Sequence, residues 1–302
     1  MLMVPSFDQF MQAVANAISL GSMYALIAIG YTMVYGILRL INFAHGDMLM
    51  VAMYFAFYCV TLFMMPWYVA LALAIIGTTL LGIGVEKVAY KPLRSAPRIS
   101  LLISAIGMSY LLENLAVVVF GGIPKNFPAV PLFQDTVMIG SVVVQRLTFI
   151  VPIVTAALVI ILLRVINHTK LGMSMRAASV DYSTSRMMGI NVDRVISFTF
   201  AIGSALAAVG ALFWMFKYNK MDPYVGMLPG LKCFIASVLG GIGNVTGAVL
   251  GGVILAFIEI MVVLFFPSLS GFKDSFAFIV LILVLLFKPN GLLGEIGGAD
   301  KA

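Results

Sequence analysis

The chain has 302 residues, of which 62% are hydrophobic and 10% are charged, and its formal net charge is +6. Soluble globular domains carry about 25% charged residues, so this composition excludes an ordinary soluble domain. The few basic residues lie in short loops and form no continuous basic face, which argues against a nucleic-acid-binding protein.

Continuous apolar runs close to the ~20 residues that cross a bilayer as a helix recur along the whole chain. Only helices and closed barrels satisfy their backbone polar groups in lipid, and barrel strands show short alternating segments instead. The sequence therefore predicts an all-α polytopic membrane protein with a single transmembrane domain over residues 1–302. The predicted crossings are 14–37, 47–65, 67–85, 100–120, 147–166, 194–216, 231–246, 247–266 and 273–288. The run 231–246 is short and glycine-rich; if it re-enters instead of crossing, the count is eight and not nine.

Lysine and arginine residues in short loops set the predicted orientation, because they favour the cytoplasmic side. They gather in 86–98 and 164–194, whereas 121–146 contains only Lys125 and Arg146. We therefore place the first two segments in the cytoplasm and the third outside. With nine crossings, the N-terminus lies outside and the C-terminus inside.

The first polar interruption is "LRLINFAHGDML" at 38–49. An ordinary turn with Asn and Asp as helix caps is one interpretation. We favour a structural break that borders a transport pathway, and the candidate pathway residues here are Asn42, Phe43, His45 and Asp47. A metal at His45 is not expected, because His168 is the only other histidine and no cluster of Cys and His exists.

The longest polar segment inside the hydrophobic sequence is "KLGMSMRAASVDYSTSRMMGINVDR", residues 170–194. It predicts one helix from Met173 to Met188 that ends at Gly189, where a glycine C-cap would sit. Apolar residues recur on one side of this helix at i, i+3, i+4 and i+7, with Arg176 and Arg186 on the other. The helix is amphipathic but too polar to cross. From these residues alone, a helix resting on the bilayer surface and a helix docked in a partner's groove remain equally open.

The polar loop "FKYNKMDPYVG" at 216–226 is external in this topology. A docking surface on this loop would use Lys217, Tyr218, Lys220 and Asp222. A solvated loop is the alternative, and the sequence does not separate the two.

The glycine-rich stretch "LGGIGNVTGAVLGG" at 239–252 repeats glycine every four residues, which favours close helix packing. An unwound segment that lines a cavity is the second interpretation, with Gly240, Gly241, Gly243, Asn244 and Gly247 as pathway candidates. Together with 38–49 it places one interruption in each half of the chain, which predicts an inverted internal repeat. The phosphate-binding pattern G-x-x-x-x-G-K-[ST] is absent, so the chain itself is not expected to hydrolyse ATP, to bind a cofactor or to be an enzyme.

Two carboxylates, Glu113 and Glu259, lie inside apolar runs. Burying either without a partner is costly, so each is expected to face the interior of the bundle. Structural pairing is the simpler interpretation, and a proton relay is the functional one.

Four motifs together resemble the permease subunits of branched-chain amino acid ABC importers, of the LivH type. They are "INFAHGDM", "KLGMSMRAASVDYSTSRMMGINVDRV", "ASVLGGIGNVTGAVLGG" and "LLFKPNGLLG", and they occur in the same order and spacing over nearly the whole chain. The resemblance implies a bacterial inner-membrane protein that moves branched-chain or other hydrophobic amino acids into the cytoplasm.

The resemblance also implies partners. They are a second, related permease, two cytoplasmic ATPases that use ATP and Mg²⁺, and a periplasmic amino-acid-binding protein. Residues 167–194 then match the cytoplasmic segment that couples the permease to the ATPases. The coupling residues implied are Met173, Met175, Arg176, Asp181, Arg186, Met187 and Gly189. The external loop 216–226 becomes a candidate docking site for the binding protein.

A self-sufficient secondary transporter, coupled to protons through Glu113 and Glu259, is the alternative from another class. It predicts uptake by the chain alone, whereas the importer requires its ATPases. A passive channel would need no energy input. The polar helix favours the importer, because neither alternative needs a docking element.

Overall fold

The computed structural model describes residues 5–94, 96–128, 130–139 and 142–294. Its helices are α1 (Phe7–Leu38), α2 (His45–Thr61), α3 (Trp67–Val85), α4 (Arg98–Phe120), α5 (Pro131–Gln134), α6 (Leu147–His168), α7 (Lys170–Val180), α8 (Tyr182–Met187), α9 (Val192–Tyr218), α10 (Met227–Gly240), α11 (Val245–Phe265) and α12 (Lys273–Phe287). Between α3 and α4 lie a π-helical turn, η1 (Glu86–Tyr90), and a 3₁₀ turn, η2 (Lys91–Leu93); a second 3₁₀ turn, η3 (Pro267–Phe272), precedes α12.

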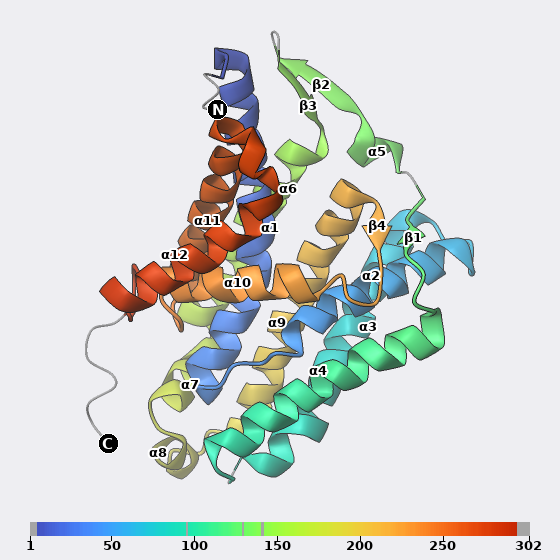
Figure 1. The fold of residues 1–302 in the computed structure, drawn as a ribbon. Coiled ribbons are helices and arrows are strands. Elements are labelled where there is room, and N and C mark those ends of the chain that lie inside the picture. Colours follow the sequence, from blue (N-terminus) through green and yellow to red (C-terminus); the bar gives the residue numbers. More distant parts are fainter. Residues whose placement is uncertain (1–4, 95, 129, 140–141, 295–302) are drawn as a thin grey trace.

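Four short strands complete the fold, namely β1 (Lys125–Asn126), β2 (Thr136–Ile139), β3 (Val142–Gln145) and β4 (Lys220–Met221). β2 and β3 form an antiparallel hairpin, and β1 pairs antiparallel with β4. The second pair joins the long loop after α4 to the loop after α9. Figure 1 shows the β2–β3 hairpin at the end of the bundle opposite to α7 and α8, and the β1–β4 pair near mid-height on the side away from them. The two loops predicted to be external are thus joined to each other, and both lie away from the predicted cytoplasmic segment.

Seven helical segments in the described residues are long and apolar enough to cross a membrane. They are Phe7–Leu38, Trp67–Leu93, Arg98–Phe120, Leu147–His168, Val192–Tyr218, Val245–Phe265 and Pro267–Phe287. α2 and α10, which would bring the count to nine, are shorter. The prediction of an all-α polytopic membrane protein is confirmed, whereas the exact number of crossings and the inverted repeat remain predictions.

α10 differs most from its predicted form. It has 14 residues, equivalent to about 21 Å of helix, against a hydrocarbon core of about 30 Å. Figure 1 shows it running crosswise to α1. A tight turn follows, because Gly241 and Gly243 adopt φ values of 109° and 99° that suit glycine. α11 then starts at Val245, so the predicted crossing 231–246 is in fact a short helix and a turn.

α1 forms the centre of the bundle and packs against α6, α9, α10 and α11. Its middle, from Met23 to Ile29, is fully buried. Small residues allow the close approach to α11: a Cβ on Gly21 would lie 2.6 Å from the Cα of Val253, and one on Gly252 would lie 2.8 Å from the Ala25 nitrogen. Such small-residue contacts let backbones meet where lipid supplies no hydrophobic driving force.

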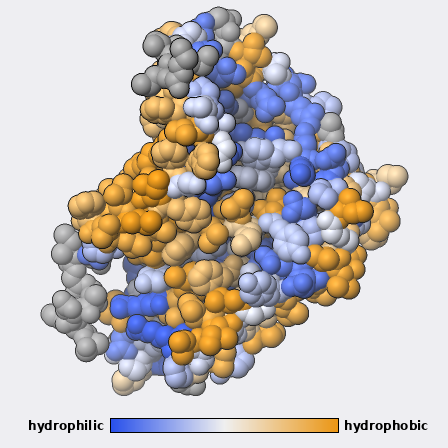
Figure 2. Space-filling view, viewed as in Figure 1, coloured by the Kyte–Doolittle hydropathy of each residue, from blue (hydrophilic) through white to orange (hydrophobic). Residues whose placement is uncertain are grey.

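The outer helices expose their apolar side chains. Only 22% of the most hydrophobic window of α4 is buried, and for the segment that ends in α12 the figure is 6%. In Figure 2, hydrophobic residues cover the region of α12 and much of that of α4. Apolar surface on this scale would be an aggregation liability in water, so it fits helices that face lipid or another membrane subunit.

Candidate functional site

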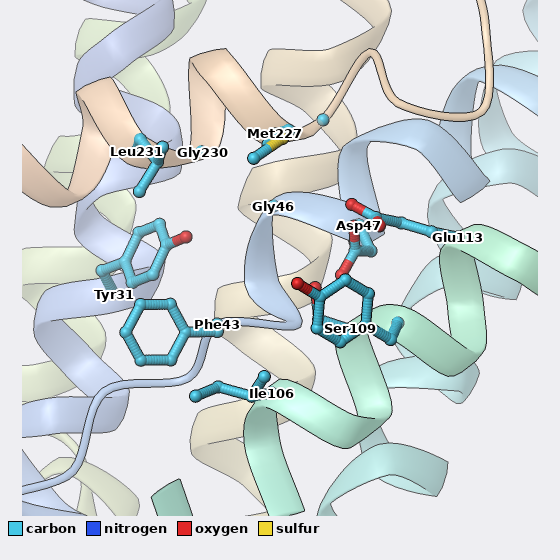
Figure 3. Close-up of a pocket in the computed structure, with 12 residues that line it drawn as sticks. Tyr31, Phe43, Gly46, Asp47, Ile106, Ser109, Glu113, Met227, Gly230 and Leu231 are labelled. Atoms are coloured by element: carbon cyan, nitrogen blue, oxygen red, sulfur yellow. The ribbon is translucent and has the colours of Figure 1, made fainter. Parts of the chain in front are cut away.

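A pocket of about 170 Å³ lies where α1, α2, α4 and α10 meet (Figure 3). Its lining residues are Tyr31, Phe43, Gly46, Asp47, Ile106, Ser109, Tyr110, Glu113, Gly226, Met227, Gly230 and Leu231. The pocket thus combines two carboxylates and several hydroxyl groups with an apolar remainder.

The N-terminal ends of α2 and α10 form one wall of the pocket through contacts between glycines. A Cβ on Gly226 would lie 2.1 Å from the carbonyl oxygen of Gly46, and one on Gly230 would lie 2.8 Å from the Cα of Gly46. No side chain fits at either position without moving backbone. The glycines therefore set how closely the two helix starts approach.

Gly226→Ala is expected to lower the free energy of unfolding by about 1–3 kcal/mol, because the added methyl group meets a backbone oxygen that cannot rotate away. The measurement is the thermal unfolding midpoint of the purified protein in detergent. Gly107→Ala, inside α4, is the matched control, since a Cβ there meets nothing within 4 Å. That change should be neutral or stabilising, by about 0.5–1 kcal/mol. Equal midpoints for both variants would show that the glycine contact is loose.

The residues predicted from 38–49 separate into two groups. Phe43 and Asp47 line the pocket. Asn42 is buried and accepts a hydrogen bond from the Tyr90 hydroxyl at 2.9 Å. The His45 ring is also buried, with Nε2 3.1 Å from the carbonyl oxygen of Ile27, and it fills the space beside Gly30. Asn42 and His45 therefore hold the break in place and do not line the pocket.

The glycine-rich stretch lies away from this pocket, at the contact of α10 with α11. A Cβ on Gly240 would lie 1.9 Å from the carbonyl oxygen of Gly247, as expected for close packing. Asn244 caps α11 by accepting a hydrogen bond from the Gly247 nitrogen at 3.0 Å. None of Gly240, Gly241, Gly243, Asn244 and Gly247 lines the pocket described above, and their part in a pathway remains a prediction.

The two intramembrane carboxylates have different surroundings. Glu259 lies 2.8 Å from the Nζ of Lys232 and accepts a hydrogen bond from the Tyr24 hydroxyl at 2.9 Å. Lys232 also lies 2.5 Å from Asp274, so a buried ion network joins α10, α11 and α12. Glu113 instead lines the pocket beside Asp47. Among the described residues, no hydrogen bond or ion pair joins Glu113 directly to Glu259.

The predicted coupling helix is broken into two. Asp181 is extended, with φ −154° and ψ 124°, and its carboxylate accepts hydrogen bonds from the backbone nitrogens of Ser183 and Thr184 at 2.6 and 3.1 Å. The Ser183 hydroxyl also donates to this carboxylate, at 2.7 Å. Its hydrogen bond, together with those from the two backbone nitrogens, lowers the pKa of Asp181, and the backbone bonds start α8. The prediction of one continuous helix was wrong because Asp is a better N-cap than a helix-interior residue. Gly189 does follow the helix end, with φ 81°.

Asp181→Ala is expected to speed hydrogen exchange at the amides of Ser183 and Thr184, because it removes their acceptor. Asp181→Asn keeps a side-chain oxygen and should leave the exchange close to that of the unmodified chain. Mass spectrometry of the exchanged protein resolves this segment. Equal protection in both variants would mean that other contacts hold α8.

The coupling residues predicted on α7 and α8 differ in how far their side chains are exposed. Met173 and Met187 are 63% and 80% exposed, and Met188 beside them is 79% exposed. Met175 is only 5% exposed, so its predicted role as an apolar contact for a partner was wrong. Its side chain packs into the core, because a helix shows only one face to its neighbours. Arg176 and Arg186 are exposed; Arg176 donates to the carbonyl oxygen of Ile166.

Two further contacts tie this segment to the membrane helices, and the sequence reasoning missed both. The hydroxyl of Tyr182 donates to the carbonyl oxygen of Ile37 near the end of α1. Arg186 lies 3.8 Å from Asp193 at the start of α9. Asp193 also pairs with Arg94, which in turn pairs with the buried Glu86 of η1. A glutamate at the end of an apolar run, followed by basic residues, was the signal available in the sequence.

The loop residues predicted to dock a partner lie at the opposite end. Tyr218 and Lys220 are exposed, and Lys217 is half-buried. Asp222 accepts a hydrogen bond from the Tyr224 nitrogen at 2.9 Å, which shapes the turn before α10. The loop therefore connects the outer end of the bundle directly to the pocket wall formed by α10.

Several known proteins that are similar to this chain over most of its length are described as branched-chain amino acid transport permeases. The sequence model of the family described as branched-chain amino acid transport system, permease component, matches residues 13–285. The chain is 41% identical to the high-affinity branched-chain amino acid transport system permease protein BraD of Pseudomonas aeruginosa, over 97% of this chain and 98% of that protein. It is 40% identical to LivH of Salmonella typhimurium over the same shares, and 27% identical to a probable LivH of Methanocaldococcus jannaschii over 92% and 91%.

These matches cover nearly the whole length of both partners, and they agree with a bundle of apolar helices that exposes hydrophobic surface. The resemblance drawn from the four sequence motifs is confirmed. The chain is a multi-pass membrane protein, and it belongs to the family of permease components of branched-chain amino acid transport systems.

Proposed function

We propose that this chain is a permease subunit of an ATP-binding-cassette importer that carries branched-chain or other hydrophobic amino acids into the bacterial cytoplasm. The observation that carries the proposal is the 41% identity over almost the full length to a permease of this kind. The protein would lie in the inner membrane beside a second, related permease. Two cytoplasmic ATPases would bind ATP and Mg²⁺, and a periplasmic binding protein would deliver the amino acid.

The exposed apolar side chains of α7–α8 support the proposal that an ATPase docks on this segment. Apolar side chains on a segment outside the bilayer gain most when a partner covers them, and Met173, Val180, Met187 and Met188 are all exposed there. Methionine adapts its shape to a partner surface. Tyr182 contacts α1 and Arg186 contacts α9. A movement of α7–α8 caused by an ATPase would be transmitted to the membrane helices through these two contacts.

In this mechanism the permease switches access by rigid-body movement around a fixed region. The pocket between α1, α2, α4 and α10 is suited to that region, because the starts of α2 and α10 meet there through glycines. External residues Lys217, Tyr218, Lys220 and Asp222 lie where a binding protein would approach. The proposal assigns no catalytic residue to this chain.

The test is reconstitution into liposomes with the second permease, the ATPases and the binding protein added one at a time. Uptake of radiolabelled leucine and ATP hydrolysis are followed together. We expect uptake only with every component present. Uptake by the lone chain that a proton ionophore abolishes would replace the importer with a proton-coupled transporter. Uptake that needs no energy source would indicate a channel.

A further inference from the structure

The pocket described above contains two acidic groups that the fold leaves without a cation. Asp47 is 3% exposed, and its Oδ2 has no hydrogen-bond partner. Within the described residues, neither Asp47 nor Glu113 forms an ion pair. A buried carboxylate without a partner is costly, and a second one beside it adds repulsion. By contrast, Glu86 and Glu259 each have a basic partner.

The geometry around these two carboxylates is that of a site and not of a packing defect. Figure 3 shows Glu113 extending from α4 toward Asp47 on α2, with Ser109 close by. The volume of about 170 Å³ far exceeds the ~10–15 Å³ that one water molecule requires. Tyr110 and Met227 on the rim are 62% and 57% exposed, so the pocket opens to the surface.

The rest of the lining limits what fits. Phe43, Ile106 and Leu231 are apolar, and no lysine or arginine of the described part of the chain contributes to the pocket. A cation with an aliphatic body would satisfy both halves of this lining: its charge would meet the carboxylates, and its carbon chain would meet the apolar side. A free anion would meet repulsion from both acids.

We propose that Asp47 and Glu113 form a subsite for the α-ammonium group of a transported aliphatic amino acid, with Phe43, Ile106 and Leu231 against its side chain. The assignment rests on the proposed function, and it names the group through which the permease itself contacts its substrate.

The test measures the local charge preference directly. A Ser109→Cys reporter is introduced into the full chain after Cys59 and Cys233 are replaced with alanine. The protein, in lipid nanodiscs, is labelled with 2-aminoethyl methanethiosulfonate, a cation, and 2-sulfonatoethyl methanethiosulfonate, an anion. We expect the cation to react faster by at least about tenfold, relative to the ratio for a free thiol. Asp47→Asn with Glu113→Gln should remove that preference, whereas Asp8→Asn, an exposed carboxylate near the N-terminus, should not.

Protection separates the possible ligands. L-leucinol, which keeps the ammonium group and the aliphatic chain, should slow labelling; 4-methylpentanoate, which lacks the ammonium group, should not. Protection by sodium chloride at the same concentration would overturn the assignment in favour of an inorganic cation. A charge preference that survives the double substitution would overturn it altogether. If Ser109→Cys does not fold, Ile106→Cys reports on the same lining.

This readout requires neither ATPases nor uptake, so its outcome is independent of the liposome test. If the liposome test shows ATP-driven uptake but the ratio of cation to anion labelling is the same with and without the Asp47→Asn and Glu113→Gln substitutions, the subsite alone is disproved. A charge preference in a chain that fails to transport with its partners would disprove the proposed function alone.

Discussion

Replacing Lys232 with methionine is expected to lower the free energy of unfolding by about 3–5 kcal/mol, the largest loss that we expect from a single substitution. Lys232 balances two carboxylates, since its Nζ lies 2.8 Å from Glu259 and 2.5 Å from Asp274. Without it, the hydrogen-bond and ion-pair partners left to Glu259 among the described residues are the Tyr24 hydroxyl and Lys273, whose Nζ is 3.8 Å away. The side chain of Glu259 is 5% exposed, so water cannot replace the lost partner.

The unfolding midpoint of the purified protein in detergent measures this loss. Lys220→Met is the matched control, because Lys220 is exposed in β4 and should change the midpoint little. Adding Glu259→Leu to Lys232→Met should recover part of the loss, since it removes the buried charge together with its partner. A Lys232→Met midpoint equal to that of the control would mean that the network contributes nothing to stability.

If α7–α8 couples the permease to its ATPases as proposed, reversing both of its exposed arginines, Arg176→Glu with Arg186→Glu, is expected to reduce ATP-driven leucine uptake at least about tenfold. The reversal replaces two positive charges with two negative ones on the face that the proposed ATPase would contact, so any carboxylate of the partner that pairs with these arginines would be repelled. It also sets residue 186 against Asp193, which lies 3.8 Å from the present arginine. Folded yield should hold, because both arginines are exposed.

The measurement pairs uptake with ATP hydrolysis in the complete importer. Arg146→Glu is the control. Arg146 lies at the opposite end of the bundle from α7–α8, so its reversal should not affect coupling to the ATPases. Loss of uptake together with loss of the ATP hydrolysis that accompanies uptake in the unmodified protein assigns the effect to coupling. Unchanged uptake in the double variant would remove α7–α8 from the coupling mechanism.

The two carboxylates that the sequence set apart illustrate what a pattern can and cannot predict. Glu113 and Glu259 look alike in sequence, each in the middle of an apolar run. The fold gives Glu259 a lysine from the neighbouring α10 and gives Glu113 an open pocket with a second acid. Which side chains pair across two helices depends on how each helix is rotated about its axis and on how far one is shifted along the other. The apolar periodicity of the sequence determines neither.

The segment α7–α8, the predicted coupling segment, shows the same limit at shorter range. Its position, polarity and terminal glycine were correctly predicted from local signals. The break at Asp181 was also a local event, because a capping carboxylate competes with a continuous helix. The burial of Met175 was not local: it depends on how α7 lies against the bundle.

The sequence by itself determined the class of protein, the approximate positions of most membrane helices, the polar segment between α6 and α9, and the family. Each of these depends on composition, on run length or on motifs in chain order, which need no knowledge of contacts. Only the tertiary structure decided which residues share a site. Asp47 and Glu113 line the same pocket, and Gly46 packs against Gly226, because α2, α4 and α10 lie side by side there. Such contacts join positions far apart in the chain, and in lipid they are set by close packing and by charge pairing, which no single stretch of sequence displays.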